Sequence, residues 1–315
     1  YLDYAEIPFL IRLLTWRGRS WRLFGFLVWP YWSRMGHEST SWPKKLYRML
    51  RREALRLLLK RGVIDIVFVH TEWAKETLLG ARAANLKLQK RVIVVPDPCE
   101  QVEHPVSPLQ ARSRLALPAE KVILLFFGRL RWDKGIDILL KAFNQLDEDV
   151  ALVIAGQEGH ITEQDIESCK KAMSGPGEII SRIGYITPEE EPLYFRAADA
   201  VVLPYRRVFR GTSGILQNAV AAEKPVIAAD VGEVGEFARR HSLGIIVEPE
   251  SPAALREGIQ QFIKNRTRME AMVRASAKQY LADHHWQRMA ELVEAAFLCP
   301  RLTGGRHGEG RMRDE

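Results

Sequence analysis

Two basic side chains flank a tight turn in the segment FFGRLRWDKGIDILLKAF, which spans residues 126–143. The segment begins as an apolar run, breaks at Gly128, places Arg129 and Lys134 around the turn, and resumes with apolar residues at helical spacing. Ligands of open α/β sheets bind beyond the carboxyl ends of the strands, where loops lead into helices. Because Gly128 leaves room for close approach to the backbone, both cations could point at one anion there.

Two further loops carry residues suited to the same anion. In AGQEGH, Gly156 leaves space beside the end of a predicted strand, and in RGTSG small residues precede a predicted helix. The first N–H groups of a helix have no partner within the helix and attract phosphate. Two cations and a helix N-terminus together predict a diphosphate site, which we assign to Gly128, Arg129, Lys134, Gly156, Arg210, Thr212, Ser213 and Gly214.

Two common phosphate-binding motifs are absent from the sequence. No GxGxxG follows a predicted strand, which argues against a dinucleotide-binding enzyme of the Rossmann type. No GxxxxGK[ST] is present either, which argues against a phosphate-loop ATPase. The diphosphate site therefore belongs to another class of α/β protein.

Alternating strands and helices must position these loops. From residue 121 the chain alternates short apolar runs with amphipathic segments at least five times, as in KVILLFFG, DKGIDILLKAFNQL and VALVIAG. Thr162, Thr187 and Ser251 are predicted to cap helices, and the helix after Thr187 is expected to begin at Pro188. The pattern is typical of a doubly wound α/β domain with a parallel sheet. Residues 63–100 repeat a shorter strand, helix, strand pattern and predict part of a second parallel sheet.

The first 62 residues are strongly basic, with thirteen Lys and Arg against four Asp and Glu. Segments 10–32 and 46–62 mix Arg with Trp and Leu and are expected to form helices with one apolar and one basic side. Such helices suit an anionic membrane surface, which we assign as a partner of residues 10–61. Core packing with extended arginine stems explains the pattern nearly as well. No nucleic-acid-binding motif accompanies the charge, so no nucleic-acid partner is expected.

The composition divides the chain into five parts. We expect an N-terminal domain at 1–102, a linker at 103–120, a C-terminal α/β domain at 121–283, a helix at 284–300 and a disordered tail at 301–315. Three distant cysteines without metal-type spacing favour a reduced, cytoplasmic setting. No apolar run is long enough to predict a membrane-spanning helix. We therefore expect a cytoplasmic protein, peripheral at the inner face of a membrane.

Four ordered motifs resemble the C-terminal half of one enzyme family. GRLRWDKGIDILLKAF, VIAGQEG, IGYITPEEEPLYFRAADAVVLPY and GTSGILQNAVAAEKPVIAADVGEVGEF are similar to segments of the family-four retaining glycosyltransferases, or glycosyl transferases group 1. The likeness covers roughly residues 121–286, and residues 64–98 resemble the end of that family's N-terminal domain. It implies the GT-B fold, in which two Rossmann-like domains face a cleft. By this resemblance, residues 1–102 are a partial, acceptor-side N-terminal domain, residues 121–283 bind the nucleotide sugar, and the helix at 284–300 packs back across the domains.

The resemblance implies roles for individual residues. Arg129 and Lys134 match the catalytic pair that binds the donor's diphosphate and stabilises the negative charge on the departing nucleoside diphosphate. Tyr185 and Ile186 match the strand end beside the nucleotide base. The start of the helix over the distal phosphate matches Ser213, Gly214 and Ile215. Such enzymes retain the configuration at the anomeric carbon and generally need neither metal nor cofactor.

The chain departs from the family where two glutamates are usual. One of these touches the transferred sugar and the other holds the ribose hydroxyls, and the matching positions are Arg210 and Asn218. Glu223 stands where a glycine is usual. An amide at Asn218 can still bond a ribose hydroxyl but lacks the charge of a carboxylate, so we expect Asn218→Glu to be tolerated and to tighten nucleoside diphosphate binding.

The sequence leaves two functions open. The first is a metal-independent, retaining glycosyltransferase of the hexosyltransferase type, which moves a sugar from a nucleotide-sugar donor to a glycan or lipid-linked acceptor in polysaccharide biosynthesis. The second is a glycosyltransferase-like binding protein that holds a nucleoside diphosphate or sugar with weak turnover. The residues that distinguish them are Arg210 and Asn218.

Overall fold

The computed structural model describes residues 22–27, 42–80, 85–99 and 106–298, which form two compact units. Unit 1 is built from residues up to Val95 together with those from Ala290 onward, and unit 2 contains Pro96–Met289. The expected tail at 301–315, and most of the helix expected at 10–32, lie outside the described residues.

Unit 1 has a parallel sheet of the order β1-β2-β3 among its described residues. Leu55, Leu58 and Leu59 of α2 pack with Val67 and Val69 of β2 in its core. The elements up to residue 95 are β1 (Phe24–Leu27), α2 (Trp42–Lys60), β2 (Ile66–Val69), α3 (Glu72–Leu79), α4 (Leu86–Gln89) and β3 (Val92–Val94).

One helix prediction in this unit is wrong. Residues 24–27, expected within a helix, form β1, which pairs in parallel with β2. The physical reason is tertiary, because Phe24 and Phe26 pack on Phe68 of β2, with ring centroids 6.1 and 4.9 Å away. The predicted helix at 46–62 is confirmed as α2, and Gly62 follows it with φ +68°.

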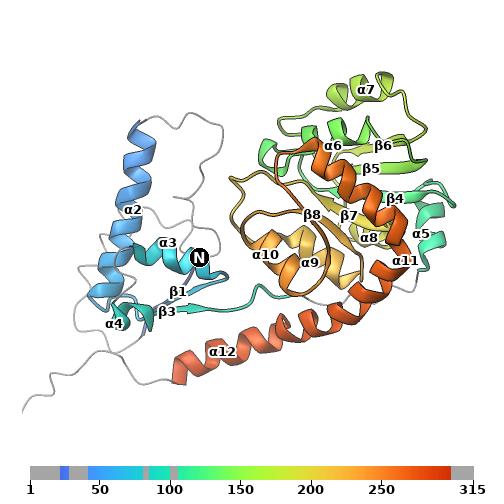
Figure 1. Cartoon of the computed structure of the whole chain (residues 1–315). Helices are drawn as coiled ribbons and strands as arrows, with labels where there is room; N and C mark the ends of the chain where they lie inside the picture. Colours follow the sequence, from blue (N-terminus) through green and yellow to red (C-terminus); the bar gives the residue numbers. More distant parts are fainter. Residues whose placement is uncertain (1–21, 28–41, 81–84, 100–105, 299–315) are drawn as a thin grey trace, which may run out of the picture. The chain divides into compact units, whose positions relative to one another are not determined.

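Unit 2 has a six-stranded parallel sheet that confirms the predicted α/β class (Figure 1). Its strand order is β6-β5-β4-β7-β8-β9, which is the doubly wound order with a switch point between β4 and β7. The elements are α5 (Pro108–Arg114), β4 (Val122–Phe127), η4 (Trp132–Lys134), α6 (Ile136–Phe143), β5 (Val150–Gly156), α7 (Glu163–Lys171), β6 (Glu178–Ile183), α8 (Glu191–Ala197), β7 (Ala200–Leu203), α9 (Gly214–Ala221), β8 (Val226–Ala229), α10 (Gly232–Arg240), β9 (Gly244–Val247) and α11 (Pro252–Asp283). The last helix, α12 (Trp286–Leu298), begins in unit 2 and belongs to unit 1 from Ala290 onward.

The inner strands of unit 2, β4, β5, β7 and β8, are apolar because helices cover both faces of the sheet. On one face, Phe126 of β4 shares a buried cluster with residues of α6, α7 and α11, among them Phe143 and Phe262. On the other face, the Phe127 ring packs against Phe195 of α8, 5.2 Å between centroids. This double covering makes the loops at the strand ends the accessible parts of the sheet.

The segment expected as a linker at 103–120 contains a helix with buried contacts. Ser107 caps α5, and Arg112 of α5 bonds the carbonyl oxygens of Ala197, Ala119 and Lys121. Arg112 also pairs with Asp199 at 2.8 Å, and both side chains are buried. Asp199 in turn accepts the N–H of Ile123 at the start of β4. This buried pair joins α5 to the amino ends of the central strands.

Two local predictions concern helix boundaries. The caps at Thr162 and Ser251 are confirmed. The predicted cap at Thr187 is wrong, because α8 begins at Glu191 rather than at Pro188. Thr187 and Glu190 exchange the expected side-chain to backbone hydrogen bonds, but these bonds close a turn that precedes the helix. Glu223, at a position where the resemblance expects glycine, has φ +57°.

Candidate functional site

The carboxyl ends of β4, β5 and β7 bring the three predicted loops together in unit 2. Gly128 donates its N–H to Ala155 O at 2.8 Å, and Leu130 donates to Gln157 O at 2.8 Å. Gly156 has φ +140°, and a Cβ there would lie 2.3 Å from Gly128 O. The loops after β4 and β5 are therefore in backbone contact, which only glycine permits at Gly156.

The turn after β4 also lies against the backbone at the end of β7. Gly135 has φ +67°, and a Cβ on it would lie 1.9 Å from Pro204 O. Arg206, in the loop after β7, donates Nε–H to Trp132 O at 3.0 Å and pairs with Asp137 of α6. Its guanidinium also lies 4.4 Å from the centre of the Trp132 ring. Arg206 thus holds the turn that presents Lys134, a role that sequence reasoning missed.

Lys134 extends back across this turn to the start of the loop. A Cβ on Gly128 would lie 2.7 Å from Lys134 Nζ and 3.7 Å from Ile215 Cδ1, so the ammonium, the glycine and the first turn of α9 meet at one place. Lys134 Nζ also lies 5.9 Å from the centre of the Tyr205 ring. Burial, with a smaller contribution from the Arg131 charge, lowers the pKa of Lys134 to about 8. A partly desolvated cation here would be stabilised by an anion.

Arg129 is exposed and points toward the β5 loop, where its Nε–H donates to Glu158 O at 3.2 Å. The structure places Arg129 and Lys134 at the two ends of one turn, with no direct contact between their side chains among the described residues. The Arg129 guanidinium therefore has N–H groups available for a ligand in front of the loop.

The start of α9 lies opposite the lysine. Ser213 caps the helix by accepting the Leu216 N–H at 3.4 Å, and its Oγ lies 3.1 Å from the Tyr205 hydroxyl. Tyr205 is buried, which raises its pKa to about 12. Gly214 is exposed, with no atom within 4 Å of a Cβ placed on it. The start of α9 is therefore accessible at Gly214, and Thr212 lies just before it, half-buried.

Three other predicted residues lie at the edges of this arrangement. Arg210 is exposed, and its Cα lies 2.8 Å from a Cβ placed on Gly232 at the start of α10. Tyr185 is 70% exposed in the loop after β6, followed by the half-buried Ile186. Gly184 donates its N–H to Gly156 O at 3.0 Å, which joins this loop to the one after β5. No contact of Tyr185 or Ile186 with Lys134 occurs among the described residues.

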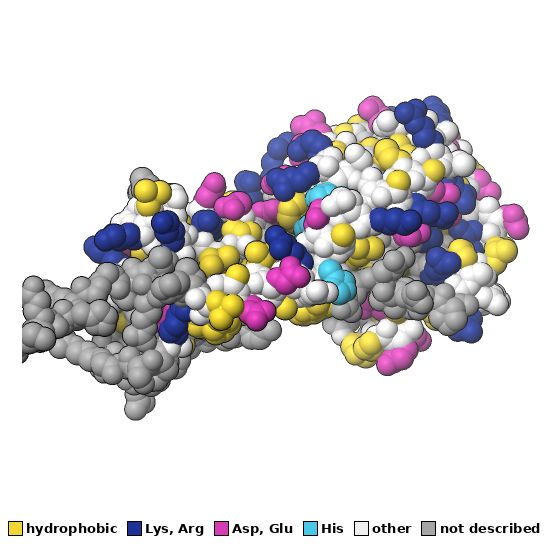
Figure 2. Space-filling model, turned by 90° about the horizontal axis from the view of Figure 1, so that it is seen from below, with side chains coloured by type: hydrophobic (Ala, Val, Ile, Leu, Met, Phe, Trp, Pro, Cys, Tyr) yellow, Lys and Arg dark blue, Asp and Glu magenta, His cyan; other side chains and the backbone are white. Residues whose placement is uncertain are grey.

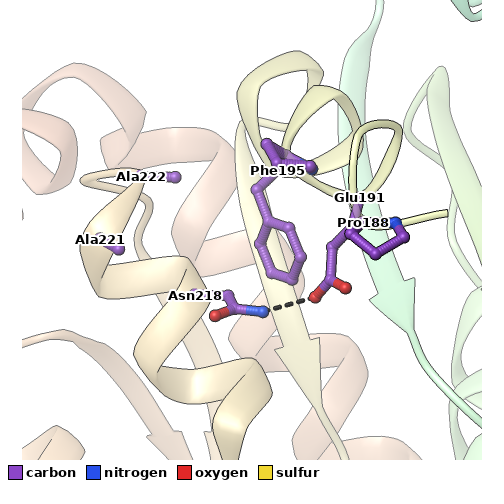
Figure 3. A pocket seen from close by; sticks show the side chains of 7 residues that line it. Pro188, Glu191, Phe195, Asn218, Ala221 and Ala222 are labelled. Atoms are coloured by element: carbon purple, nitrogen blue, oxygen red, sulfur yellow. Dashed lines mark hydrogen bonds between the residues drawn. The ribbon is translucent and has the colours of Figure 1, made fainter. Parts of the chain in front are cut away.

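Asn218 faces a partner that sequence reasoning missed. Its Nδ2–H donates to Glu191 Oε1 of α8 at 2.6 Å (Figure 3). Burial raises the pKa of Glu191, and the Asn218 hydrogen bond opposes that rise. The two side chains line a cavity of about 250 Å³ with Pro188, Pro192, Phe195, Ala221 and Ala222. Pattern alone gave no signal for this contact, because the partners are 27 residues apart.

Charge on the surface of unit 2 is mixed. On the face seen in Figure 2, Lys and Arg side chains lie interspersed with Asp and Glu. Several of the ion pairs are local, as in Arg240 with Glu236 and Arg266 with Glu270. The three loops around Lys134 are therefore better candidates for an anion site than a broad basic face.

Comparison with known proteins identifies relatives of the C-terminal part. Residues 109–279 match the family model described as glycosyl transferases group 1. A D-inositol 3-phosphate glycosyltransferase 1 from Catenulispora acidiphila is 35% identical over 207 residues, which cover 62% of this chain and 48% of that protein. A glycogen synthase from Mycobacterium tuberculosis is 26% identical over 210 residues, covering 65% of this chain and 48% of that protein. The chain thus spans about half the length of these curated relatives.

Solved structures share the fold. A sucrose-phosphate synthase from Thermosynechococcus elongatus superposes with a TM-score of 0.66 at 20% identity, covering 86% of this chain and 66% of that one. The HepE protein of Anabaena in complex with UDP superposes with a TM-score of 0.63 at 15% identity, covering 78% of this chain and 67% of that one.

Proposed function

Because the chain belongs to the glycosyl transferases group 1 family, we propose that it transfers a sugar from a nucleotide-sugar donor to a glycan or lipid-linked acceptor. The observation that carries the proposal is the meeting of Lys134 Nζ, Gly128 and the first turn of α9 at the switch point of the sheet. A diphosphate seated there would contact an ammonium and a helix N-terminus together. The UDP complex of the fold relative HepE supports a nucleotide donor.

The residues of this site would act on the leaving group. As the bond between the anomeric carbon and the diphosphate oxygen breaks, negative charge grows on the diphosphate, and Lys134 and Arg129 offset it. The acceptor oxygen forms its bond to the same carbon, on the face that the diphosphate leaves, and its proton passes to the departing phosphate. Retention of configuration and independence of metal are both parts of this proposal, because the two cations would supply the charge that a metal supplies elsewhere.

The stereochemistry and the metal question have one direct test. Incubation of the full chain with a UDP-sugar and a short glycan acceptor should give a product with the anomeric configuration of the donor, read by proton NMR. Excess EDTA should leave the rate unchanged. An inverted product, or loss of the rate in EDTA that Mg²⁺ restores, would contradict this part of the proposal.

A second candidate is a binding protein of the same fold with weak turnover. Arg210 and Asn218 favour it, because neither supplies the carboxylate that the family resemblance expects at these positions. The two functions separate in one assay. A chain that binds UDP but neither transfers nor hydrolyses any of several UDP-sugars would support the binding protein.

An anionic membrane surface is the proposed partner of unit 1, at the cytoplasmic face. The described part of the basic segment is α2, whose N-terminal half exposes Trp42, Tyr47 and Leu50 beside Lys44 and Lys45. Its C-terminal half is core, with Arg56 bonded to Leu78 O, so the membrane proposal rests on the exposed N-terminal half alone. Among the described residues, no helix is long and apolar enough to cross a membrane.

Vesicle sedimentation tests the membrane proposal. The protein should bind vesicles that contain phosphatidylserine, and the bound fraction should fall between low and high salt because surface charge is screened. Replacement of Lys44 and Lys45 by Gln should reduce binding. Equal binding to neutral vesicles would point to apolar insertion alone and contradict the electrostatic proposal.

A further inference from the structure

The hydrogen-bonded pair of Glu191 and Asn218 lines a cavity between α8 and α9 (Figure 3). Its other walls are apolar and come from Pro188, Pro192, Phe195, Ala221 and Ala222. The carboxylate and the amide are the polar groups among the side chains that line it. A ligand that fills this cavity would therefore place hydroxyl or amide groups at the pair and an apolar or aromatic surface against the rest.

The cavity lies along α9 from the proposed diphosphate site. Asn218 follows Gly214 by four residues, so the two lie on one side of the helix about 6 Å apart along its axis. Ala221 lies about 10 Å from Gly214 along the same axis. A nucleoside joined to a diphosphate at the start of α9 could extend along the helix toward Asn218, where the cavity offers it two hydrogen-bonding side chains.

The pair is suited to a sugar with neighbouring hydroxyls. Asn218 uses one N–H on Glu191 Oε1, and this bond holds the carboxylate in one orientation. Among the described residues, the other carboxylate oxygen and the amide oxygen have no hydrogen-bond partner, which leaves two acceptors. Half-burial of Glu191 removes part of its hydration, so hydroxyl donors would gain more from bonding it than in open water.

We propose that Glu191 is the carboxylate that binds the ribose hydroxyls of the donor nucleotide, and that Asn218 positions it through their shared hydrogen bond. The inference rests on the proposed function, since it assumes a nucleotide with its diphosphate at the start of α9. The carboxylate that the family resemblance expects on α9 is thereby supplied from α8, across the cavity.

This arrangement reverses one expectation from the sequence. Asn218→Glu alone would set a second carboxylate against Glu191 at hydrogen-bond distance, and two close carboxylates repel one another. The single variant should therefore weaken nucleotide binding. Exchange of both residues, Glu191→Gln with Asn218→Glu, returns one carboxylate to α9 beside an amide on α8 and should recover binding.

Calorimetric titration of the full chain tests the proposal with UDP, GDP and ADP at pH 7.5. The nucleotide that binds most tightly is then compared with its 2′,3′-dideoxy analogue. We expect Glu191→Gln to weaken binding of the parent nucleotide about tenfold to a hundredfold, the range for a hydrogen bond to a charged group. The same variant should bind parent and analogue with nearly equal affinity, because the hydroxyls have lost their partner.

Glu189→Gln is the matched control, because Glu189 is exposed two residues earlier and its loss removes the same charge. It should leave affinity and discrimination unchanged. Melting temperature checks folding, and Asn218→Ala serves as a second variant that removes the positioning bond but keeps the carboxylate. It should weaken binding less than Glu191→Gln does.

Two failures are distinguishable. If no nucleoside diphosphate binds the wild-type chain, the proposed function fails, and this inference fails with it. If one binds, and Glu191→Gln still prefers the parent nucleotide over the dideoxy analogue by the wild-type factor, the proposed function stands and the role of Glu191 is wrong.

Discussion

Lys134 should make nucleotide binding depend on pH in the weakly alkaline range. Burial lowers its pKa to about 8 in the free protein, so the ammonium loses its proton at a pH where other lysines keep theirs. A bound diphosphate favours the charged form and raises this pKa, so binding takes up a proton. The affinity is therefore fully present below the free-state pKa and falls as the pH rises from that value toward the higher pKa of the bound state.

The magnitude follows from the fraction of Lys134 that carries a proton. With a pKa of about 8, that fraction falls from roughly three quarters at pH 7.5 to roughly one tenth at pH 9.0. UDP affinity should fall about eightfold over this interval. Calorimetry at pH 8.0 in two buffers of different ionisation enthalpy should also show uptake of about half a proton per UDP.

Lys134→Arg is the control, because a guanidinium keeps its charge throughout this range. Titration of the nucleotide itself affects both proteins equally, so the difference between them reports the lysine. Affinity that falls by the same factor in wild type and Lys134→Arg would refute the assignment of this proton to Lys134. Wild-type affinity that does not change with pH would refute it as well.

Three further predictions concern catalysis and stability. Arg129→Ala should lower kcat by about a hundredfold, because the guanidinium offsets charge on the leaving group, and should leave the melting temperature unchanged, because the side chain is exposed. Transfer kinetics and thermal denaturation measure the two effects, and normal turnover would contradict the prediction. Asp199→Asn should lower the free energy of unfolding by about 3 kcal/mol, because Arg112 is left buried without its counter-charge. Urea denaturation measures this loss of stability, and a change below about 0.5 kcal/mol would show that the pair contributes little. Glu223→Gly should raise the free energy of unfolding by about 0.5–1 kcal/mol in the same urea denaturation, because a backbone φ of +57° is strained for Glu but not for Gly. Glu223→Ala is the control: it keeps the strain and should not raise the free energy of unfolding.

The parts of the fold that the sequence predicted well are those whose signal is local. The strands from Val122 and Val150 are buried on both faces, so each reads as an unbroken apolar run. Thr162 and Ser251 cap helices through contacts three residues away. These features need no knowledge of distant parts of the chain.

The parts that were missed depend on tertiary contacts or on mixed composition. Residues 24–27 were read as helix because apolar and basic residues surround them at helical spacing, whereas their pairing with β2 decides the structure. The local pattern does not predict the edge strand β6, because Ser181 and Arg182 interrupt its apolar residues, and only the family resemblance implies a strand end near Tyr185. The segment around Arg112 was read as a linker from its Pro and Ser content, and its buried bond to Asp199 spans 87 residues.

The candidate site shows the same division. That Gly128 and Lys134 lie close together could be predicted, because both belong to one strand to helix junction. The contacts of Arg206, Tyr205 and Glu191 could not be predicted, because Arg206 and Tyr205 lie in the loop after β7, Glu191 lies on α8, and the partners of Arg206 and Glu191 are distant in the sequence. Side-chain identity at Asn218 suggested a weakened ribose contact, and only the structure shows a carboxylate beside it.

A structure of the full chain bound to UDP tests the central claim most directly. The account predicts that the terminal phosphate lies at the start of α9, with an oxygen within about 3.2 Å of Lys134 Nζ and others accepting the N–H groups of Gly214 and Ile215. A diphosphate bound away from the loops at Gly128 and Gly214, with Lys134 not in contact with it, would contradict the account.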